Sequence, residues 1–360
     1  MAPLPQRARG ASLDPGNRFS RREIVFDGDE LDHEALDEGA PDRTEVYRDT
    51  SRSVISRNAS PDVPFDLSLN PYRGCEHGCS YCYARPTHEY LGLSAGLDFE
   101  RKVFAKLDAA HQLERTLAAS TWVPKHVALS GVTDPYQPIE RRLGITRACL
   151  EVLATHRQPV SIITKNALVL RDLDLIGELA TFGAVRVALS VTTLDEALRR
   201  RLEPRTSTAV NRLRTVRTLA DVGVPVSVMV APVIPGLNDH EIPSILEAAA
   251  AAGAQRADWT LLRLPGAVAS VFVTWLEEQV PMRAGRVLAR LREAHRGALT
   301  DARFGHRMRG EGPYVQQLSA IFAVHRRRMG LDRPSAPLDG SHFRVPGRSE
   351  QVGLFDGGGR

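Results

Sequence analysis

The sequence predicts an α/β fold in which six strand–helix units form a parallel sheet that curls into an open, TIM-like partial (β/α)6 barrel. From residue 65 onward, short apolar runs alternate with segments whose apolar residues recur every three or four positions, which is typical of repeated βα units. The expected strands are residues 65–69, 126–130, 160–164, 185–191, 224–230 and 259–264. The expected helices are residues 99–119, 145–155, 170–181, 212–222 and 241–252. Because crossovers between parallel strands are right-handed, the carboxyl ends of the strands should share one rim, where such barrels carry their chemistry.

Composition limits the setting in which this fold works. The chain has 360 residues, enough to bury a sizeable core. Its four cysteines, three of them in one cluster, are typical of a reduced intracellular protein and not of a disulfide scaffold. No apolar run approaches the length of a membrane span and the N-terminus lacks a signal-peptide core, so we expect a soluble cytoplasmic protein with no membrane partner.

Four regions follow from the pattern along the chain. Residues 1–60 are rich in Pro, Gly and charged residues with little periodicity, which predicts a flexible N-terminal extension. Residues 61–270 contain the barrel. Residues 271–332 read as a helical, arginine-rich extension, and residues 333–360 as a flexible tail.

Three cysteines, Cys75, Cys79 and Cys82, stand within eight residues directly after the first expected strand. Thiolates are soft ligands that suit zinc or iron–sulfur clusters and not Mg²⁺ or Ca²⁺. A structural zinc site usually takes four ligands, and no second cysteine pair or pair of histidines follows. Three thiolates therefore favour a [4Fe-4S] cluster with one iron left for a small molecule, and a zinc knuckle is the alternative.

The Cys-x3-Cys-x2-Cys spacing, with Tyr81 before the last cysteine, resembles the cluster loop of the radical S-adenosylmethionine (radical SAM) superfamily. Further stretches resemble its spore photoproduct lyase and DNA repair photolyase-like branch, over roughly residues 55–330. These stretches are residues 58–62, 70–79, 84–88, 96–100, 133–140, 191–195, 202–205 and 304–310. The resemblance implies that Cys75, Cys79 and Cys82 ligate a [4Fe-4S] cluster and that S-adenosylmethionine (SAM) binds its open iron. It also implies a reductant such as flavodoxin or ferredoxin, whose electron releases a 5'-deoxyadenosyl radical from SAM.

Polar residues at the ends of the expected strands are candidates for binding SAM. Asp134 and Glu140 follow the second strand and could receive its ammonium group, although Asp134 could instead cap a turn. Lys165 follows the third strand, where an ammonium group can hold the SAM carboxylate. Ser190 and Thr192 end the fourth strand and can reach ribose or methionine atoms.

Further cofactor contacts are expected from aromatic and loop residues. Tyr81 and Tyr83 flank Cys82. Residues 231–239, which include Ile234 and Asn238, offer a stiff segment where adenine could stack or hydrogen-bond. The alternative for Asn238 is a helix cap.

The chain departs from the spore photoproduct lyases at one place. Those lyases carry a cysteine just after the second strand, whereas residues 130–132 here are Ser-Gly-Val. Cys149 lies in a helical pattern and is expected in the core. Tyr136 is a candidate hydrogen donor in its place. Glu203 and Arg205 are expected to brace the rim.

The substrate is predicted from charge. Residues 283–329 contain eleven arginines against three acidic residues, with aromatic residues among them, which favours a surface that faces nucleic acid. A solvated arginine-rich helix is the alternative. The favoured function is therefore a radical SAM enzyme that acts on DNA as a lyase or repair enzyme. Two alternatives stay open: radical SAM modification of a peptide, RNA or small molecule, and a non-catalytic iron–sulfur or zinc protein.

The end of the chain suggests a partner. Gln351, Leu354 and Phe355 resemble the short peptide by which bacterial replication and repair proteins bind the sliding clamp. Leu354 and Phe355 could bury in an apolar pocket while Gln351 fixes the register. The alternative is a frayed terminus.

Overall fold

The computed structural model of the chain describes residues 9–19, 44–334 and 336–347. Its larger sheet has seven strands in the order β10-β9-β8-β7-β6-β3-β2. Six of them run parallel, and β2 (Ile55–Arg57) pairs antiparallel with β3 at one edge. The parallel strands are β3 (Leu67–Leu69), β6 (Val127–Leu129), β7 (Val160–Thr164), β8 (Val185–Ser190), β9 (Val226–Val233) and β10 (Arg256–Leu261). The six predicted strands are thus confirmed, in an open sheet whose edges are β10 and β2.

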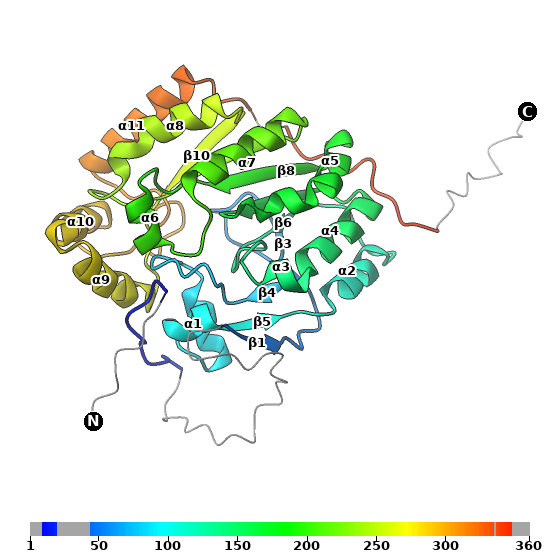
Figure 1. Cartoon of the computed structure of the whole chain (residues 1–360), viewed down its shortest axis with the longest axis horizontal. Helices are drawn as coiled ribbons and strands as arrows, with labels where there is room; N and C mark the ends of the chain where they lie inside the picture. Colours follow the sequence, from blue (N-terminus) through cyan, green and yellow to red (C-terminus); the bar gives the residue numbers. More distant parts are fainter. Residues whose placement is uncertain (1–8, 20–43, 335, 348–360) are drawn as a thin grey trace, which may run out of the picture.

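Helices cover the outer face of this sheet (Figure 1). Those that connect successive strands are α2 (Ala109–Leu117), α4 (Ile145–His156), α5 (Leu173–Thr181), α7 (Ala209–Asp221) and α8 (Ile242–Ala251). Alternate strand residues such as Val187, Leu189 and Val228 are fully buried in the core cluster beneath them. Several of the intervening positions, which face the other way, carry short side chains: Ser68, Ala128, Ser161, Ala188, Ser227 and Ala231. Ile163, Arg186 and Met229 are longer, so the inner face is less uniformly apolar than the helix-covered face.

Shorter helices lie at the strand ends. They are α1 (Leu97–Arg101), α3 (Glu140–Leu143), α6 (Glu196–Leu202), and the 3-10 turns η1 (Arg85–Thr87), η2 (Glu89–Leu91), η3 (Ala167–Asp172) and η4 (Asp239–Glu241). The single helix expected over residues 99–119 is wrong in its first half, where β5 (Lys102–Ala105) follows α1. Val103 and Phe104 favour a strand, and β5 pairs with β1 (Glu45–Arg48) and β4 (Tyr72–Arg73) in a three-stranded sheet.

The N-terminal region differs from the flexible extension that the sequence predicts. Residues 45–48 and 55–57 form β1 and β2, one in each sheet. Farther upstream, Gly10 and Ala11 donate backbone hydrogen bonds to the Glu100 carboxylate at 3.1 and 2.8 Å. Local composition could not reveal these contacts, because each partner lies in another part of the chain.

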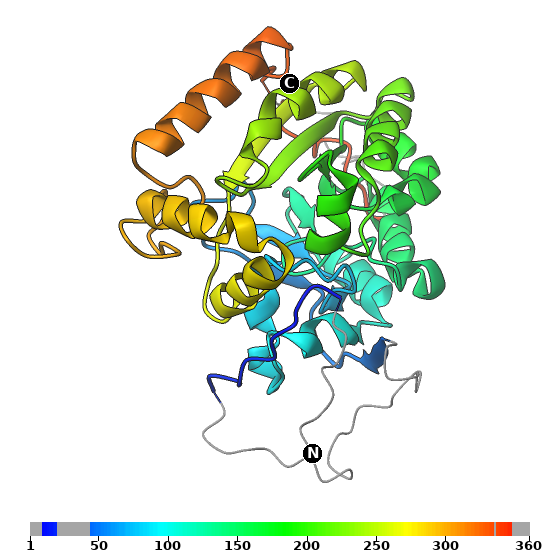
Figure 2. The ribbon, with the colours of Figure 1, turned by 60° about the vertical axis from the view of Figure 1, so that its left-hand side comes forward.

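Three helices follow the barrel: α9 (Val268–Gln279), α10 (Pro281–Ala294) and α11 (Pro313–Arg328). α11 packs along α8, whereas α9 and α10 lie on the side of the sheet where the carboxyl ends of the parallel strands meet (Figure 2). Beyond them, Asp339 and Arg344 bond through their backbone to Gly183 and His156, so residues 339–344 contact the barrel. The proposed clamp motif, residues 351–355, lies outside the described residues and stays a prediction. In the part of the chain that is described, no helix has the length and apolarity of a membrane span.

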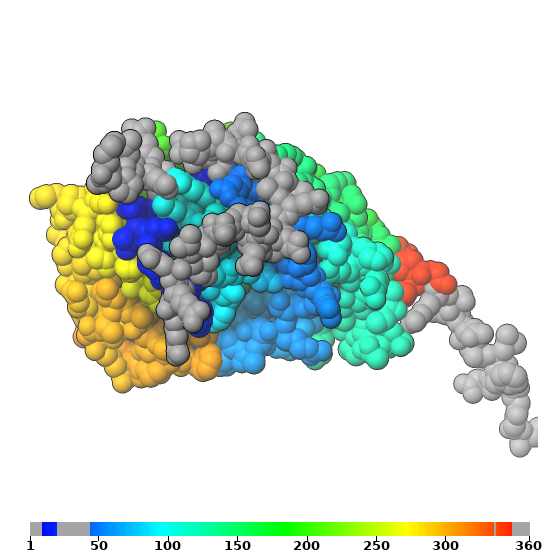
Figure 3. All heavy atoms as spheres, turned by 90° about the horizontal axis from the view of Figure 1, so that it is seen from below, coloured from blue at the N-terminus to red at the C-terminus, as the bar shows by residue number. Residues whose placement is uncertain are grey.

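Residues 303–309 cross the open side of the sheet. At the β10 edge, the Leu261 N–H donates to the Met308 carbonyl at 2.9 Å. At the other edge, Arg307 forms an ion pair with Asp62, in the loop between β2 and β3. Figure 3 shows this orange segment beside blue residues of that loop. We call residues 303–309 the latch.

Candidate cofactor and substrate site

The loop after β3 carries the three clustered cysteines. Cys75 and Cys79 are buried, and Cys82 is partly buried. The Cys75 N–H donates to the Phe99 carbonyl at 3.0 Å. Gly74 has φ +78°, and a Cβ at this position would lie 2.9 Å from the His88 ring. Glycine is thus required at the bend that turns Cys75 toward the other two cysteines.

The segment after β6 holds this loop from one side. The Gln137 amide oxygen accepts from the Glu76 N–H at 2.9 Å, and its nitrogen donates to the Gly74 carbonyl at 3.2 Å. The Thr133 hydroxyl donates to the same carbonyl at 2.7 Å. Because Gln137 and Thr133 are buried, these bonds fix the loop without competition from water.

Arg85 holds the loop from the other side. Its guanidinium is fully buried and donates to the Cys79 carbonyl at 3.0 and 2.8 Å. It also forms an ion pair with Glu100, the carboxylate that accepts from Gly10 and Ala11. We call residues 9–11 the strap, because they pack over the loop at Gly78. Sequence reasoning missed this brace, since Arg85, Glu100 and the strap are distant in the chain.

The chemistry of the three thiols fits an iron–sulfur cluster. Burial raises the pKa of Cys75, Cys79 and Cys82, although backbone N–H groups of His77 and Asp134 at Cys75 and of Ala84 at Cys82 oppose this shift. A metal centre supplies the positive charge that buried thiolates need. No three His, Cys, Asp or Glu side chains among the described residues converge on a single-ion site. A [4Fe-4S] cluster binds each thiolate through a separate iron, so it does not require that convergence.

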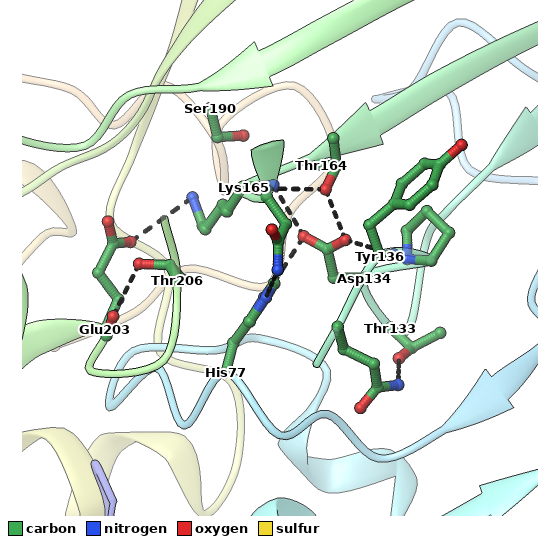
Figure 4. A network of polar contacts seen from close by, with 12 residues as sticks. His77, Thr133, Asp134, Tyr136, Thr164, Lys165, Ser190, Glu203 and Thr206 are labelled. Carbon is green, nitrogen blue, oxygen red and sulfur yellow. Dashed lines mark hydrogen bonds and ion pairs between the residues drawn. The ribbon is translucent and has the colours of Figure 1, made fainter. Parts of the chain in front are cut away.

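Lys165 stands beside the cysteine loop, directly after β7 (Figure 4). Its ammonium nitrogen lies 3.1 Å from the Ala231 carbonyl and 3.3 Å from the Thr192 hydroxyl. It is 3.8 Å from a Glu203 oxygen and 5.7 Å from the centroid of the Tyr81 ring. The structure therefore brings together three predicted site residues, Lys165, Thr192 and Tyr81.

Glu203, just after α6, is the anionic centre of this group. It is fully buried, pairs with Arg212 of α7, and accepts hydrogen bonds from Tyr81 and Thr192. Burial disfavours its charged form, but Arg212 and Lys165 outweigh burial and lower the pKa of Glu203 to about 2. The carboxylate is therefore ionised, and its bracing contacts agree with the sequence expectation.

A family model described as the radical SAM superfamily matches residues 69–249, from β3 to α8. The chain belongs to the radical SAM superfamily. It is therefore an enzyme, and the cofactors of its superfamily are SAM and a [4Fe-4S] cluster.

Relatives and solved structures agree with this assignment. An uncharacterised protein of Mycobacterium tuberculosis strain H37Rv is 39% identical over 236 residues, which cover 65% of this chain and 68% of the relative. An uncharacterised protein of Methanocaldococcus jannaschii is 28% identical over 199 residues, 55% of this chain and 71% of the relative. A solved spore photoproduct lyase, complexed with dinucleoside spore photoproduct, matches with a TM-score of 0.56 at 16% identity. The match covers 79% of this chain and 78% of that lyase, and it concerns the fold.

Two acidic residues predicted to bind the SAM ammonium group have protein partners instead. One Asp134 oxygen accepts from Thr164 at 2.7 Å and from the Tyr136 N–H, and the other accepts from the Lys165 N–H at 2.8 Å (Figure 4). His77, which sequence reasoning missed, lies 3.4 Å from the second oxygen. These contacts favour the turn-capping alternative for Asp134, which also positions Lys165.

Glu140 is fully buried at the start of α3. Its carboxylate binds Arg171 at 2.6 Å and accepts from the Thr146 N–H and the Tyr72 hydroxyl. This favours a bracing role over contact with the SAM ammonium group. Tyr136 is also fully buried, in the main core, so the structure does not place it as a hydrogen donor beside the cysteines.

The remaining predicted contacts lie on the same rim. Asn238 accepts from the Ile234 N–H at 2.6 Å and donates to the Thr192 carbonyl at 2.8 Å, so it joins the segments after β8 and β9. It stands at the N-cap position of η4, but its side chain makes no capping hydrogen bond there. Ile234 packs in the apolar cluster that also contains Cys79 and Tyr81.

Ser190 and Tyr83 flank the site in different ways. Ser190 is buried near Lys165 (Figure 4). Tyr83 is 53% exposed, and its hydroxyl donates to the Gly131 carbonyl at 2.7 Å. More than half of Tyr83 is therefore accessible to solvent, directly after Cys82. Cys149 is fully buried in the main core, as its helical pattern indicated.

Proposed function

We propose that this radical SAM enzyme acts on DNA, as a lyase or repair-type enzyme. The observation that carries the proposal is the placement of its exposed aromatic residues. Among the described aromatic side chains, four are largely exposed: Phe19 (53%), Tyr83 (53%), Tyr90 (71%) and Phe304 (57%). Each lies near an arginine, and we call these four rings with Arg18, Arg263 and Arg307 the strip.

The contacts within the strip are specific. The Arg18 guanidinium lies 4.7 Å from the Phe19 ring centroid and 5.8 Å from that of Tyr90. Arg307 lies 4.4 Å from the Phe304 ring centroid. Arg263 interacts electrostatically with both Tyr83 and Arg307. The strip therefore passes from the latch to the residue beside Cys82.

The segment 263–266 connects the two ends of the strip. A Cβ at Gly266 would lie 3.7 Å from an Arg18 nitrogen and 3.8 Å from Pro86. Figure 3 shows residues 9–19, in dark blue, between the cyan region that follows the cysteine loop and the yellow C-terminal helices. Guanidinium groups suit backbone phosphates and aromatic faces suit bases, which is the usual combination for binding single-stranded nucleic acid.

The arginine-rich helices contribute less than the sequence suggested. Arg326, Arg327 and Arg328 end α11, and the chain then contacts Ala257 and Arg256 at the start of β10. Arg307 belongs to the latch beside the other end of β10. The eleven arginines that are close together in the sequence therefore do not form one surface, because the fold places them at different ends of β10.

The chemistry would divide between cofactor and chain. When bound, the cluster and SAM would supply a radical that removes hydrogen from the substrate. Lys165 is the candidate to hold the SAM carboxylate, with Ser190, Thr192 and the segment of Ile234 and Asn238 around the rest of the molecule. The likeness in fold to spore photoproduct lyase, which was solved with a dinucleoside spore photoproduct, supports a nucleic-acid substrate.

The proposal is tested with anaerobically reconstituted protein, SAM and a chemical reductant. We expect DNA, and ultraviolet-irradiated DNA above all, to increase the formation of 5'-deoxyadenosine, and we expect DNA affinity to fall steeply with salt. If RNA increased the formation of 5'-deoxyadenosine equally, RNA would replace DNA as the proposed substrate. Stimulation by neither nucleic acid, together with salt-independent binding, would reject it.

A further inference from the structure

Arg263 is held firmly at the end of β10. Its neighbours Leu262 and Leu264 are buried in the apolar cluster that contains Cys79 and Tyr81. The Leu262 N–H also donates to the Val233 carbonyl at 2.9 Å. Two anchored leucines thus fix the backbone on both sides of Arg263, whose own side chain is only half-buried.

The other two arginines of the strip are neutralised. Arg18 pairs with Glu89 at 2.9 Å, and Arg307 pairs with Asp62. Asp62 also accepts from the Gly305 N–H at 2.6 Å, so its oxygen atoms are occupied. Within residues 9–19, 44–334 and 336–347, no hydrogen bond or ion pair reaches the Arg263 guanidinium.

An unpaired guanidinium in this position is unfavourable for the isolated protein. Burial and the neighbouring Arg307 lower the pKa of Arg263. A guanidinium nevertheless stays protonated, so the charge persists, and the carboxylate that acts on it at longer range, Asp62, is already paired with Arg307. An anion that binds here would gain a planar, two-pronged donor that is already oriented.

We infer that Arg263 binds one backbone phosphate of an unpaired DNA segment that lies along the strip, with the flanking bases on Tyr83 and Phe304. This inference rests on the DNA-directed function proposed above and adds the form of DNA and the residue that positions it. Aromatic faces can stack on bases only where the bases are free of a partner strand, so four exposed rings favour single-stranded or locally opened DNA over intact duplex.

The experiment compares two substitutions that remove one positive charge each. Arg263→Gln removes the proposed phosphate contact. Arg328→Gln is the matched control, because Arg328 is exposed at the end of α11, away from the strip. The probes are a labelled oligothymidylate of about 12 nucleotides and the same strand in a duplex with oligodeoxyadenylate. Binding is measured by fluorescence anisotropy over a series of salt concentrations.

We expect the parent protein to bind the single strand about tenfold more tightly than the duplex. Arg263→Gln should weaken single-strand binding about tenfold and reduce the slope of log affinity against log salt by about 0.7, the value for one phosphate contact. Arg328→Gln should leave both quantities unchanged. If Arg263→Gln lowers the iron content, Arg263→Lys is used in its place. Because lysine keeps the positive charge, we expect a smaller loss of single-strand affinity and an unchanged salt slope.

The outcomes separate this inference from the proposed function. Equal effects of the two glutamine substitutions, or equal binding of duplex and single strand by the parent, would overturn the inference while the DNA-directed function stands. Absence of any DNA binding and of DNA-stimulated SAM cleavage in the parent would overturn both.

Discussion

At the scale of single residues, the four cysteines show how surroundings divide one side-chain type between two roles. Cys149 is enclosed in α4 among apolar side chains and acts as a small core residue. Cys75, Cys79 and Cys82 stand on one loop whose backbone is tied to Phe99, Arg85 and Gln137. Only this second group presents several sulfur atoms to a common ligand.

Cys79→Ala should abolish the [4Fe-4S] cluster, because two remaining thiolates cannot hold three irons of the cube. Iron and sulfide content and the visible absorbance of anaerobically purified protein give the result. Cys149→Ala is the control and should retain full iron content. A parent protein with stoichiometric zinc and no sulfide would contradict the assignment.

Lys165→Met should weaken SAM binding by about 1.5 to 3 kcal/mol, the usual contribution of a hydrogen bond to a charged group. The substitution keeps the bulk of the side chain and removes its charge. Equilibrium dialysis of SAM against the reconstituted protein measures the effect. Lys125→Met, an exposed position near the opposite strand ends, should not change the affinity; an unchanged affinity in Lys165→Met would reject the carboxylate contact.

The sequence predicted those residues whose signal is local. The cysteine spacing and the position of Lys165 directly after an apolar strand can be recognised without knowing the fold. His77, Arg85 and the partners of Asp134 could not be recognised, because each role depends on a contact made across the fold. For Asp134 the sequence left a ligand contact and a turn cap both open, and the bonds from the Thr164 hydroxyl and from the backbone N–H groups of Tyr136 and Lys165 favour the cap.

At the scale of elements, Glu203 is a junction. Its carboxylate follows α6 and joins Arg212 of α7 to Lys165 at the end of β7. Buried ion pairs of this kind are costly to break, because removal of one partner leaves the other charged and desolvated. The relative positions of three elements around the site therefore depend on one negative charge.

Glu203→Gln should lower the free energy of unfolding at pH 7 by roughly 3 kcal/mol, since the pKa falls from 4.5 to about 2 on folding. A lowered carboxyl pKa stabilises the fold above pH 4.5 and loses that effect as the pH falls toward 2. The difference between parent and variant should therefore shrink with acidification. Urea unfolding from pH 7 down to about pH 2.5 measures it, with the exposed Glu247→Gln as control; a difference independent of pH over that range would contradict this account.

The strap is the second element with a testable role. A Cβ on Gly10 would lie 1.6 Å from the Gly78 carbonyl oxygen, within the backbone of the cysteine loop. Gly10→Ala should therefore displace the strap and increase hydrogen exchange in residues 75–82. Gly16→Ala is the control, because no atom lies within 4 Å of a Cβ at that position. Unchanged exchange in Gly10→Ala would show that the strap does not protect the loop.

Element prediction failed where packing overrode local pattern. Residues 99–119 have helical spacing throughout, but β5 forms within them because β1, from a region with no periodicity, pairs with it. The six parallel strands were predictable because each is an apolar run buried against helices. β5 depends instead on pairing with β4 on one side and with the distant β1 on the other, and the sequence of residues 99–119 gives no sign of either partner.

At the scale of the whole molecule, the sheet is open and its two edges are joined by the latch. Among the described residues, β10 and β2 do not pair with each other, so no ladder of backbone hydrogen bonds closes the gap between these two edges of the sheet. Contacts of the latch with Leu261 and Asp62 take its place.

This arrangement has a mechanical consequence. A strand ladder would have to lose several neighbouring hydrogen bonds together before the two edges could part. Arg307 and Met308 are consecutive residues that contact opposite edges, so loss of the ion pair between Arg307 and Asp62 would separate the edges while Met308 stays bonded to Leu261.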